Sequence, residues 1–434
     1  MIFEKFTYRI FVLYWPVVMF NYLLLMGSKL NLTILLVDAP LVLFVIKAAS
    51  AMFMKRNGPF IKVFGLYALF VLLSIFAYAF NETPVICYLK GIQYYFVPLC
   101  FAPLGYYFCS DYKYNKSYLY ACAICFAVGF FLYATLPPYY VSFLAEEQGY
   151  EQFRQDELFG ITRFSSFLPG SYNISFLSVP ALILSLSYSV NQNAGIKKWL
   201  CFLIASISFV AAIICQQRIS MFFAVFVVLF YSFYLSRHGN RTIVFVAIGV
   251  IVILALIINN YVSEMPFYDA LQESVLGRFE KMDVSVALSE RTGQYSTFNR
   301  ATWWSYIVGL GMGSCGHLVI PYHLQAIYDG EFVKTFYEFG LIGTSLFTIL
   351  TIMTLLRGVK LFRYLHSEVL IMLFFLGACV GASALTFFIY NSMFWFAMGR
   401  IWNKNYLALR KQEMARNIMG KNKRNNYCYV EYGN

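Results

Sequence analysis

Charged side chains are scarce in this sequence. Asp, Glu, Lys and Arg make up 12% of its 434 residues, about half the share found in an average soluble domain. Hydrophobic residues make up 60%, and apolar runs of about 20 residues, long enough to cross the hydrocarbon core of a bilayer, recur along the chain. This composition excludes a soluble or disordered protein. We expect an all-α, polytopic integral membrane protein with about 11 or 12 transmembrane helices.

Groups that bind metal ions are also few. The chain has four His residues, and most of its ten Cys residues fall inside apolar runs, where a thiol behaves as a small apolar side chain. Cys122 and Cys125 form a C-x-x-C motif, but without a second ligand pair it does not predict zinc. The acidic residues of the polar segments are dispersed and form no D-x-D motif. We therefore expect neither a metal nor a cofactor.

A signal-peptidase cleavage site is missing after the first apolar run. We therefore interpret that run as a membrane anchor and not as a removed signal. A twelfth, short span after the break at Asn391 and Ser392 is an open alternative to a single last helix. The predicted spans cover residues 8–27, 32–53, 61–80, 86–109, 118–136, 173–190, 198–215, 219–236, 242–260, 332–356 and 368–390.

Lys and Arg cluster in the short loops on one side of these spans. By the positive-inside rule this side is the cytoplasm, and both termini are expected there. The net charge of +12 reflects mainly this bias, together with a basic tail at 406–434 that follows a membrane domain at 1–405. Such a tail can rest on anionic lipid. We therefore expect the lipid bilayer, and not nucleic acid, as the partner of these cations.

The opposite side carries two long polar segments, 137–172 and 261–331. Both combine aromatic and charged residues, so we expect the functional site on this external face. In the first segment, Arg163 directly precedes the apolar stretch FSSFLPGSY, near the membrane surface. The second segment predicts an amphipathic helix, then another short helix. It continues into GLGMGSCG at 309–316, where glycines allow tight turns or a close approach to a ligand.

The second segment ends where a membrane helix begins. Asp329 and Gly330 precede this helix, and Glu331, Lys334 and Glu338 follow. At positions i, i+3 and i+7, these three side chains share one helix face. We expect Glu331 and Lys334 to be solvated at the helix mouth. Glu338 lies deeper in the membrane and needs a partner, for which Lys334 or a tyrosine could serve.

The order of these features resembles a known superfamily. GLGMGSCGH is followed by Asp329 and, after ten further residues, by Gly340 in EFGLIG. This region is similar to the signature of the bacterial O-antigen polymerases (Wzy) and O-antigen ligases (WaaL). It also resembles the shape, elongation, division and sporulation glycosyltransferases (RodA and FtsW).

Three arginines extend the resemblance. Arg218 follows two glutamines at a span boundary, Arg163 lies in the first external segment, and Arg291 lies in SERTGQ of the second. Each is similar to an arginine of the O-antigen superfamily. The likeness covers about residues 160–345.

The resemblance implies an inverting membrane glycosyltransferase of the bacterial inner membrane, which uses undecaprenyl diphosphate-linked oligosaccharide. We expect a polysaccharide polymerase of the Wzy type, which transfers the growing glycan onto the next lipid-linked repeat unit. A chain-length regulator (Wzz-like) and a flippase are its expected partners. An O-antigen ligase stays open, although ligases have a His where this chain has Asp329. A RodA/FtsW-type peptidoglycan glycosyltransferase and a lipid-linked oligosaccharide flippase (Wzx-type transporter) stay open as well.

The same resemblance implies roles for individual residues. Arg163, Arg218 and Arg291 would bind the diphosphate, because the planar guanidinium fork pairs with two phosphate oxygens and keeps its proton. For Arg218, the alternative is a snorkelling side chain in a tight turn between two helices.

The acceptor hydroxyl needs a base or an orienting group. Asp329 is the first candidate and Glu338 the second, and the alternative for Asp329 is a helix N-cap. Candidate contacts to the acceptor or the glycan are His317, His323, Tyr295 and Trp304.

Overall fold

The computed structural model of the chain consists of helices joined by loops. Within the described residues, six helices are long and apolar enough to cross a membrane. The chain is therefore an all-α, multi-pass membrane protein, as the composition predicts. The structure describes residues 2–28, 32–54, 58–108, 111–135, 137–140, 142–143, 164–168, 170–190, 196–215, 217–237, 298, 300–327, 330–381, 384–385 and 390–415.

The part of the chain up to residue 135 contains four of these six spans, and one of the four is broken. The broken span runs from Val85 to Tyr107 and contains Pro98 and Pro103, which remove backbone donors and interrupt regular helix. The elements are α1 (Ile2–Ser28), η1 (Ile34–Asp38), α2 (Ala39–Met54), α3 (Pro59–Leu73), η2 (Ser74–Phe80), α4 (Val85–Gly91), η3 (Ile92–Phe96), α5 (Val97–Leu99), α6 (Phe101–Tyr107) and α7 (Lys113–Thr135).

The part of the chain after residue 170 supplies the centre of the bundle and most elements of the candidate site. They are α11 (Ser171–Val190), α12 (Lys198–Ile214), α13 (Arg218–Arg237), α17 (Trp303–Val308), η4 (His317–Tyr322), α18 (Glu331–Lys360), α19 (Phe362–Gly381) and α20 (Ser392–Trp402). Each predicted span overlaps one of these helices, except the span 242–260, which lies outside the described residues. The last predicted span ends earlier than expected, at Gly381, and a separate short helix follows the break at Asn391.

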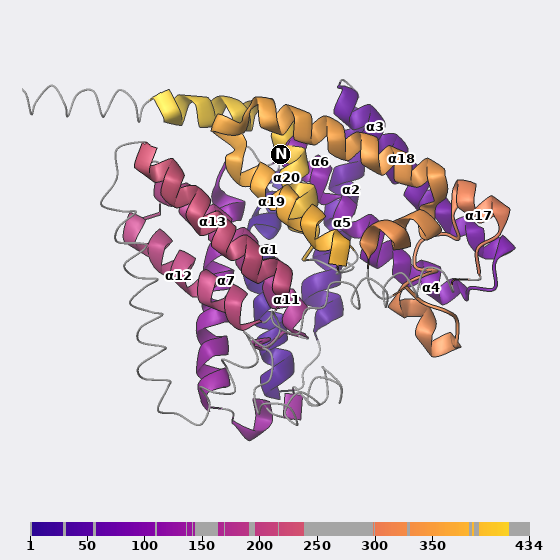
Figure 1. Cartoon of the computed structure of the whole chain (residues 1–434), viewed down its shortest axis with the longest axis horizontal. Helices are drawn as coiled ribbons and strands as arrows, with labels where there is room; N and C mark the ends of the chain where they lie inside the picture. The colour runs from indigo at the N-terminus through magenta and orange to yellow at the C-terminus, as the bar shows by residue number, and fades with distance from the viewer. Residues whose placement is uncertain are drawn as a thin grey trace, which may run out of the picture.

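The helix α20 lies in the middle of the bundle, packed on α6 (Figure 1). Two glycines allow the two helices to approach closely. A Cβ atom at Gly399 would lie 2.0 Å from the carbonyl oxygen of Ala102, and one at Gly105 would lie 2.5 Å from that of Phe396. Without a hydrophobic driving force between helices in lipid, such small-residue contacts are a main source of packing energy.

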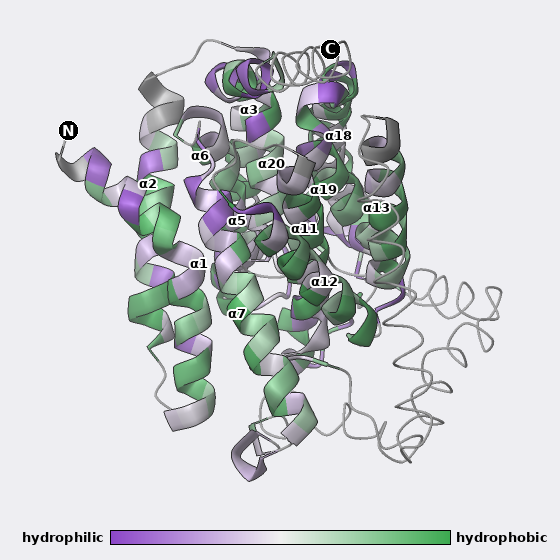
Figure 2. Ribbon diagram, turned by 90° about the vertical axis from the view of Figure 1, so that its left-hand side faces the viewer, coloured by the Kyte–Doolittle hydropathy of each residue, from purple (hydrophilic) through white to green (hydrophobic). Residues whose placement is uncertain are grey.

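The two ends of the bundle differ in what covers them. At one end α17 lies beside the start of α18, and we name it the loop end (Figure 1). At the other, which we name the tail end, residues 404–415 form a further helix. Tyr406, Arg410 and Glu413 of this helix are buried, so the described part of the basic tail packs against the bundle. Apolar residues line the middle of α1, α7 and α13 (Figure 2).

Candidate functional site

The helix α18 is broken after its first turns. Gly340 has φ 60° and ψ −168° inside the helix, a conformation that favours glycine. A Cβ atom there would lie 2.4 Å from the carbonyl oxygen of Ile307 in α17. The break sets residues 331–339 apart as a short helical segment at the loop end. Its N-cap is Gly330, and Asp329, the residue before it, lies outside the described residues.

The glycine-rich loop at 309–316 lies against this break. The N–H groups of Leu310 and Gly311 donate to the carbonyl oxygens of Tyr337 and Glu338, each at 2.8 Å. The break at Gly340 interrupts the helical hydrogen bonds that these carbonyls would otherwise accept, so the loop satisfies them instead. A Cβ atom at Gly309 would lie 2.2 Å from the Glu338 carbonyl oxygen. The glycines predicted for a close approach thus approach the chain itself.

The carboxylate of Glu338 is fully buried beneath this loop. Its Oε1 accepts the backbone N–H of Cys315 at 3.0 Å, and its Oε2 accepts the hydroxyl of Tyr95 in η3. The ring of Tyr95 meets that of Phe339 edge-on. A buried carboxylate is costly unless donors satisfy it, and here two donors do. The prediction that Lys334 or a tyrosine partners Glu338 is confirmed for a tyrosine.

Glu331 and Lys334 share the face of Glu338 and are also buried, with 1% and 2% of their surface exposed. The Nζ of Lys334 lies 3.5 Å from both carboxylate oxygens of Glu331. Glu331 Oε2 also accepts the N–H of Leu385, from the break between α19 and α20, at 3.1 Å. The expectation that these two residues are solvated is wrong, because the loop and the α19–α20 break cover the helix mouth. We name Glu331, Lys334 and Glu338 the α18 cluster.

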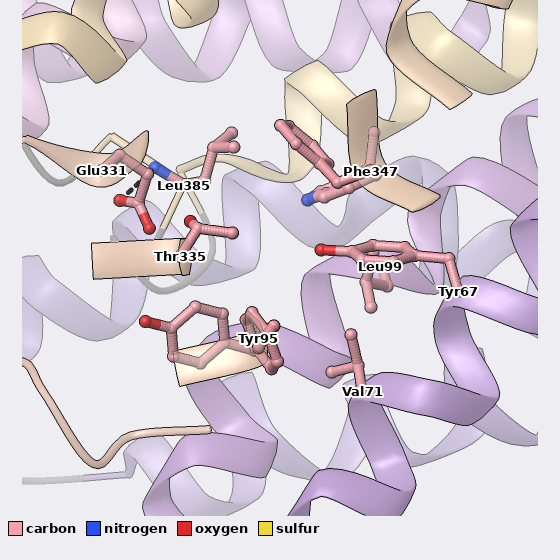
Figure 3. Close-up of a pocket in the computed structure, with 10 residues that line it drawn as sticks. Tyr67, Val71, Tyr95, Leu99, Glu331, Thr335, Phe347 and Leu385 are labelled. Carbon is pink, nitrogen blue, oxygen red and sulfur yellow. Dashed lines mark hydrogen bonds between the residues drawn. The ribbon is translucent and has the colours of Figure 1, made fainter. Parts of the chain in front are cut away.

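A small cavity opens beside the α18 cluster. Glu331 and Thr335 lie on one side of it and Tyr67 and Phe347 on the other (Figure 3). Its volume is about 10 Å³, room for about one water molecule. The cavity can hydrate the cluster, but a sugar ring does not fit in this conformation.

Cys315 contributes its backbone and not its thiol. Burial raises the pKa of the Cys315 thiol, and the neighbouring Glu338 raises it further. A protonated, buried thiol is a poor nucleophile. Among the described residues, no group of three His, Cys, Asp or Glu side chains is arranged to hold a metal ion.

Arg300 fixes the loop from the side, a role that the sequence did not reveal. One guanidinium nitrogen donates to the carbonyl oxygens of Ser314, at 2.7 Å, and Gln325, at 3.1 Å. Another donates to the hydroxyl of Thr83 at 2.6 Å. Arg300 thus ties the loop region to the turn before α4. No motif surrounds this arginine, and its partners lie up to 217 positions away.

The three predicted arginines are only partly within the described residues. Arg163 and Arg291 lie outside them. Arg218 is exposed and is the first residue of α13, just after α12 ends at Ile214. It therefore lies at a tight turn, as the snorkelling alternative also requires. The N–H of Phe164, the residue after Arg163, donates to the Ile214 carbonyl oxygen at 3.4 Å, so the chain following Arg163 lies against this turn.

The remaining predicted site residues are also only partly within the described residues. Tyr295 and Asp329 lie outside the described residues. His317, His323 and Trp304 are exposed at the loop end, whereas Glu338 is buried. Trp304 stacks on the neighbouring Trp303, with ring centroids 3.7 Å apart. The structure thus separates an exposed aromatic and histidine surface from the buried α18 cluster.

Comparisons with protein-family models, with curated proteins and with solved structures give no match to the chain.

Proposed function

We propose that this protein is a polysaccharide polymerase of the O-antigen polymerase (Wzy) type in the bacterial inner membrane. It would transfer a growing glycan from undecaprenyl diphosphate onto the next lipid-linked repeat unit. The observation that carries the proposal is the α18 cluster. A membrane helix that starts two residues after Asp329 buries three ionisable side chains next to a glycine-rich loop. Ionisable residues are costly to bury in a membrane protein, so those that occur there usually have a function.

We assign Asp329 the role of base. As the glycosidic bond to the diphosphate breaks, the acceptor hydroxyl must lose a proton, and a carboxylate within hydrogen-bond reach can take it. Asp329 lies two residues before the first turn of α18. Glu338 is the second candidate. Because both of its carboxylate oxygens accept donors and the cavity is small, we assign it the task of holding the glycine-rich loop in position.

We assign the leaving diphosphate to Arg218, Arg163 and Arg291. Fixed guanidinium groups aimed at the departing diphosphate stabilise the transition state, where negative charge grows on the leaving group. Arg218 is exposed at the start of α13, and the contact between Phe164 and Ile214 supports a shared site for Arg163 and Arg218. In this scheme the loop end is the external face, a flippase supplies the substrate, and a Wzz-like regulator sets chain length.

The test uses purified full-length protein in liposomes with a synthetic lipid-linked repeat unit. We expect products of two and more repeat units on the same lipid carrier, resolved by mass spectrometry, and no such products from Asp329→Asn. Transfer to a lipid A-core acceptor without lengthening would indicate a ligase. Movement of the labelled unit across the bilayer without any new glycosidic bond would indicate a flippase, and either result would replace the polymerase.

A further inference from the structure

A large apolar groove lies between α2, α3 and the η3–α6 segment. Its volume is about 560 Å³, within the range of about 300 to 1,000 Å³ that is usual for ligand sites. Small residues line it on both helices, which leaves the space between them open: Ala48 and Ala49 on α2, and Gly65 and Ala68 on α3. The remaining lining is apolar, except for Lys62.

The groove is as deep as one leaflet of a bilayer. Lys62 and Leu72 both line it and both belong to α3. Ten residues of helix at 1.5 Å each separate them, which is about 15 Å, half of a hydrocarbon core of about 30 Å. The membrane-spanning helix begins at Pro59, so Lys62 lies in its first turn, at the membrane surface. The groove thus extends from the surface to the middle of the bilayer.

We propose that this groove binds one glycerophospholipid from the leaflet in which α3 begins. One acyl chain of the lipid lies along the apolar walls toward Leu72, and the lipid phosphate pairs with the exposed ammonium of Lys62. The phosphate of a membrane lipid lies at the depth of the first turn of a spanning helix, so charge and chain match the two ends of the groove. A non-helical protein segment is a poor occupant, because its backbone polar groups would face hydrocarbon without partners.

The bound acyl chain would also support the candidate site, because it would pack on a segment that contributes to that site. Phe96 and Leu99 line the groove, and Leu99 also lines the cavity beside Glu331. Tyr95, next to Phe96 in the same π-turn, donates to Glu338. A lipid in the groove therefore packs on the segment that orients Glu338. This inference does not depend on the reaction that the α18 cluster serves.

The test is native mass spectrometry of the full-length protein, purified in detergent and mixed with phosphatidylglycerol or with diacylglycerol of the same chains. We expect one phosphatidylglycerol to stay bound through delipidation. Ala49→Phe places a large ring in the groove and should remove it. Ile46→Phe is the matched control, because Ile46 is exposed on the same helix and does not line the groove; its retention should equal that of the wild type.

Lys62→Gln tests the headgroup without filling the groove. We expect it to lower the retention of phosphatidylglycerol to the level of diacylglycerol. The loss should be about tenfold, the effect of losing one hydrogen bond to a charged group. Equal retention of the two lipids by the wild-type protein would overturn the proposal and indicate annular lipid only. Equal losses in Ala49→Phe and Ile46→Phe would overturn it as well. If Ala49→Phe does not fold, the comparison of the two lipids in wild type and Lys62→Gln decides alone.

Discussion

Two groups of buried charges lie at opposite ends of this bundle. The α18 cluster lies at the loop end. At the tail end, Glu368 accepts the hydroxyl of Tyr406 at 2.6 Å and that of Ser367 at 2.8 Å. We name the tail-end residues His366, Glu368, Arg410 and Glu413 the tail cluster; each is at most 5% exposed.

The two clusters are held in different ways. In the tail cluster, Tyr112 donates to Glu413, the hydroxyl of Tyr231 lies 2.9 Å from His366 Nδ1, and Arg410 donates to the Tyr364 carbonyl oxygen at 2.9 Å. The bonds of Glu413 and Arg410 join the helix at 404–415 to the bundle. The α18 cluster instead depends on a helix break, a glycine-rich loop and a cavity. The comparison teaches that burial of charge alone does not mark a site, because one cluster holds a helix in place, whereas the other lies beside a glycine-rich loop and a cavity.

The largest expected effect belongs to Asp329→Asn. If Asp329 takes the acceptor proton, the amide cannot replace it, and transfer should fall by about 10²- to 10⁴-fold. The measurement is glycan chain length from a polymerase-deleted strain that carries the variant, with membrane protein levels matched. A ladder like that of the wild type would remove Asp329 from the reaction.

Replacement of one carboxylate in each cluster should distinguish a residue that is needed for activity from one that only holds the helix at 404–415 in place. Glu338→Gln keeps the shape but weakens the charged hydrogen bonds to Tyr95 and Cys315, so we expect activity to fall about tenfold to a hundredfold. Glu368→Gln is the matched control and should lower the melting temperature while leaving activity near that of the wild type. If Glu368→Gln loses as much activity per folded molecule as Glu338→Gln, the two clusters do not differ in function as we propose.

A smaller effect is expected when one phenol hydroxyl is removed. Tyr95→Phe leaves Glu338 with one donor fewer, and Tyr406→Phe does the same to Glu368. Each should lower the free energy of unfolding by about 1 to 3 kcal/mol. Only Tyr95→Phe should also lower the rate of transfer, because only Tyr95 helps to hold the glycine-rich loop. Thermal unfolding and the liposome assay, run on both variants, provide the measurements; equal activities would place Tyr95 among the fastening residues.

The smallest effect on activity is expected from Arg218→Lys. It keeps the charge but loses the planar fork, and since Arg218 is exposed we expect a loss of about fivefold in polymerisation. The control is Arg237→Lys, at the opposite end of α13. Initial rates of repeat-unit addition measure the effect. If Arg218→Lys retains full activity, the snorkelling role is the better explanation.

The helices were predictable from the sequence because an apolar run of membrane length has few alternatives to a spanning helix. The shared face of Glu331, Lys334 and Glu338 followed from helical spacing, and the need of Glu338 for a partner followed from its depth. The identity of that partner did not follow. Tyr95 is 243 positions away from Glu338, and local periodicity contains no information about such a pair.

Two further features were out of reach for related reasons. The role of Arg300 did not follow from the sequence, because its acceptors lie 14, 25 and 217 positions away, beyond the range of local spacing. The burial of Arg410 was missed because a basic tail after the last span is normally solvated. Burial by itself lowers the pKa of Arg410, but the nearby Tyr406, Tyr112 and Glu368 raise it more. The guanidinium therefore keeps its charge inside the tail cluster.

The close contact between α6 and α20 constrains how the protein is made. With 11 residues, α20 is about 16 Å long, too short to cross a bilayer alone, and it carries the fully buried Arg400. During synthesis α6 is inserted long before α20 leaves the ribosome, so the surface around Gly105 has no α20 to pack against until that later helix is made. We expect α20 to enter as a hairpin with α19, and an insertion reporter should integrate the pair but release α20 alone.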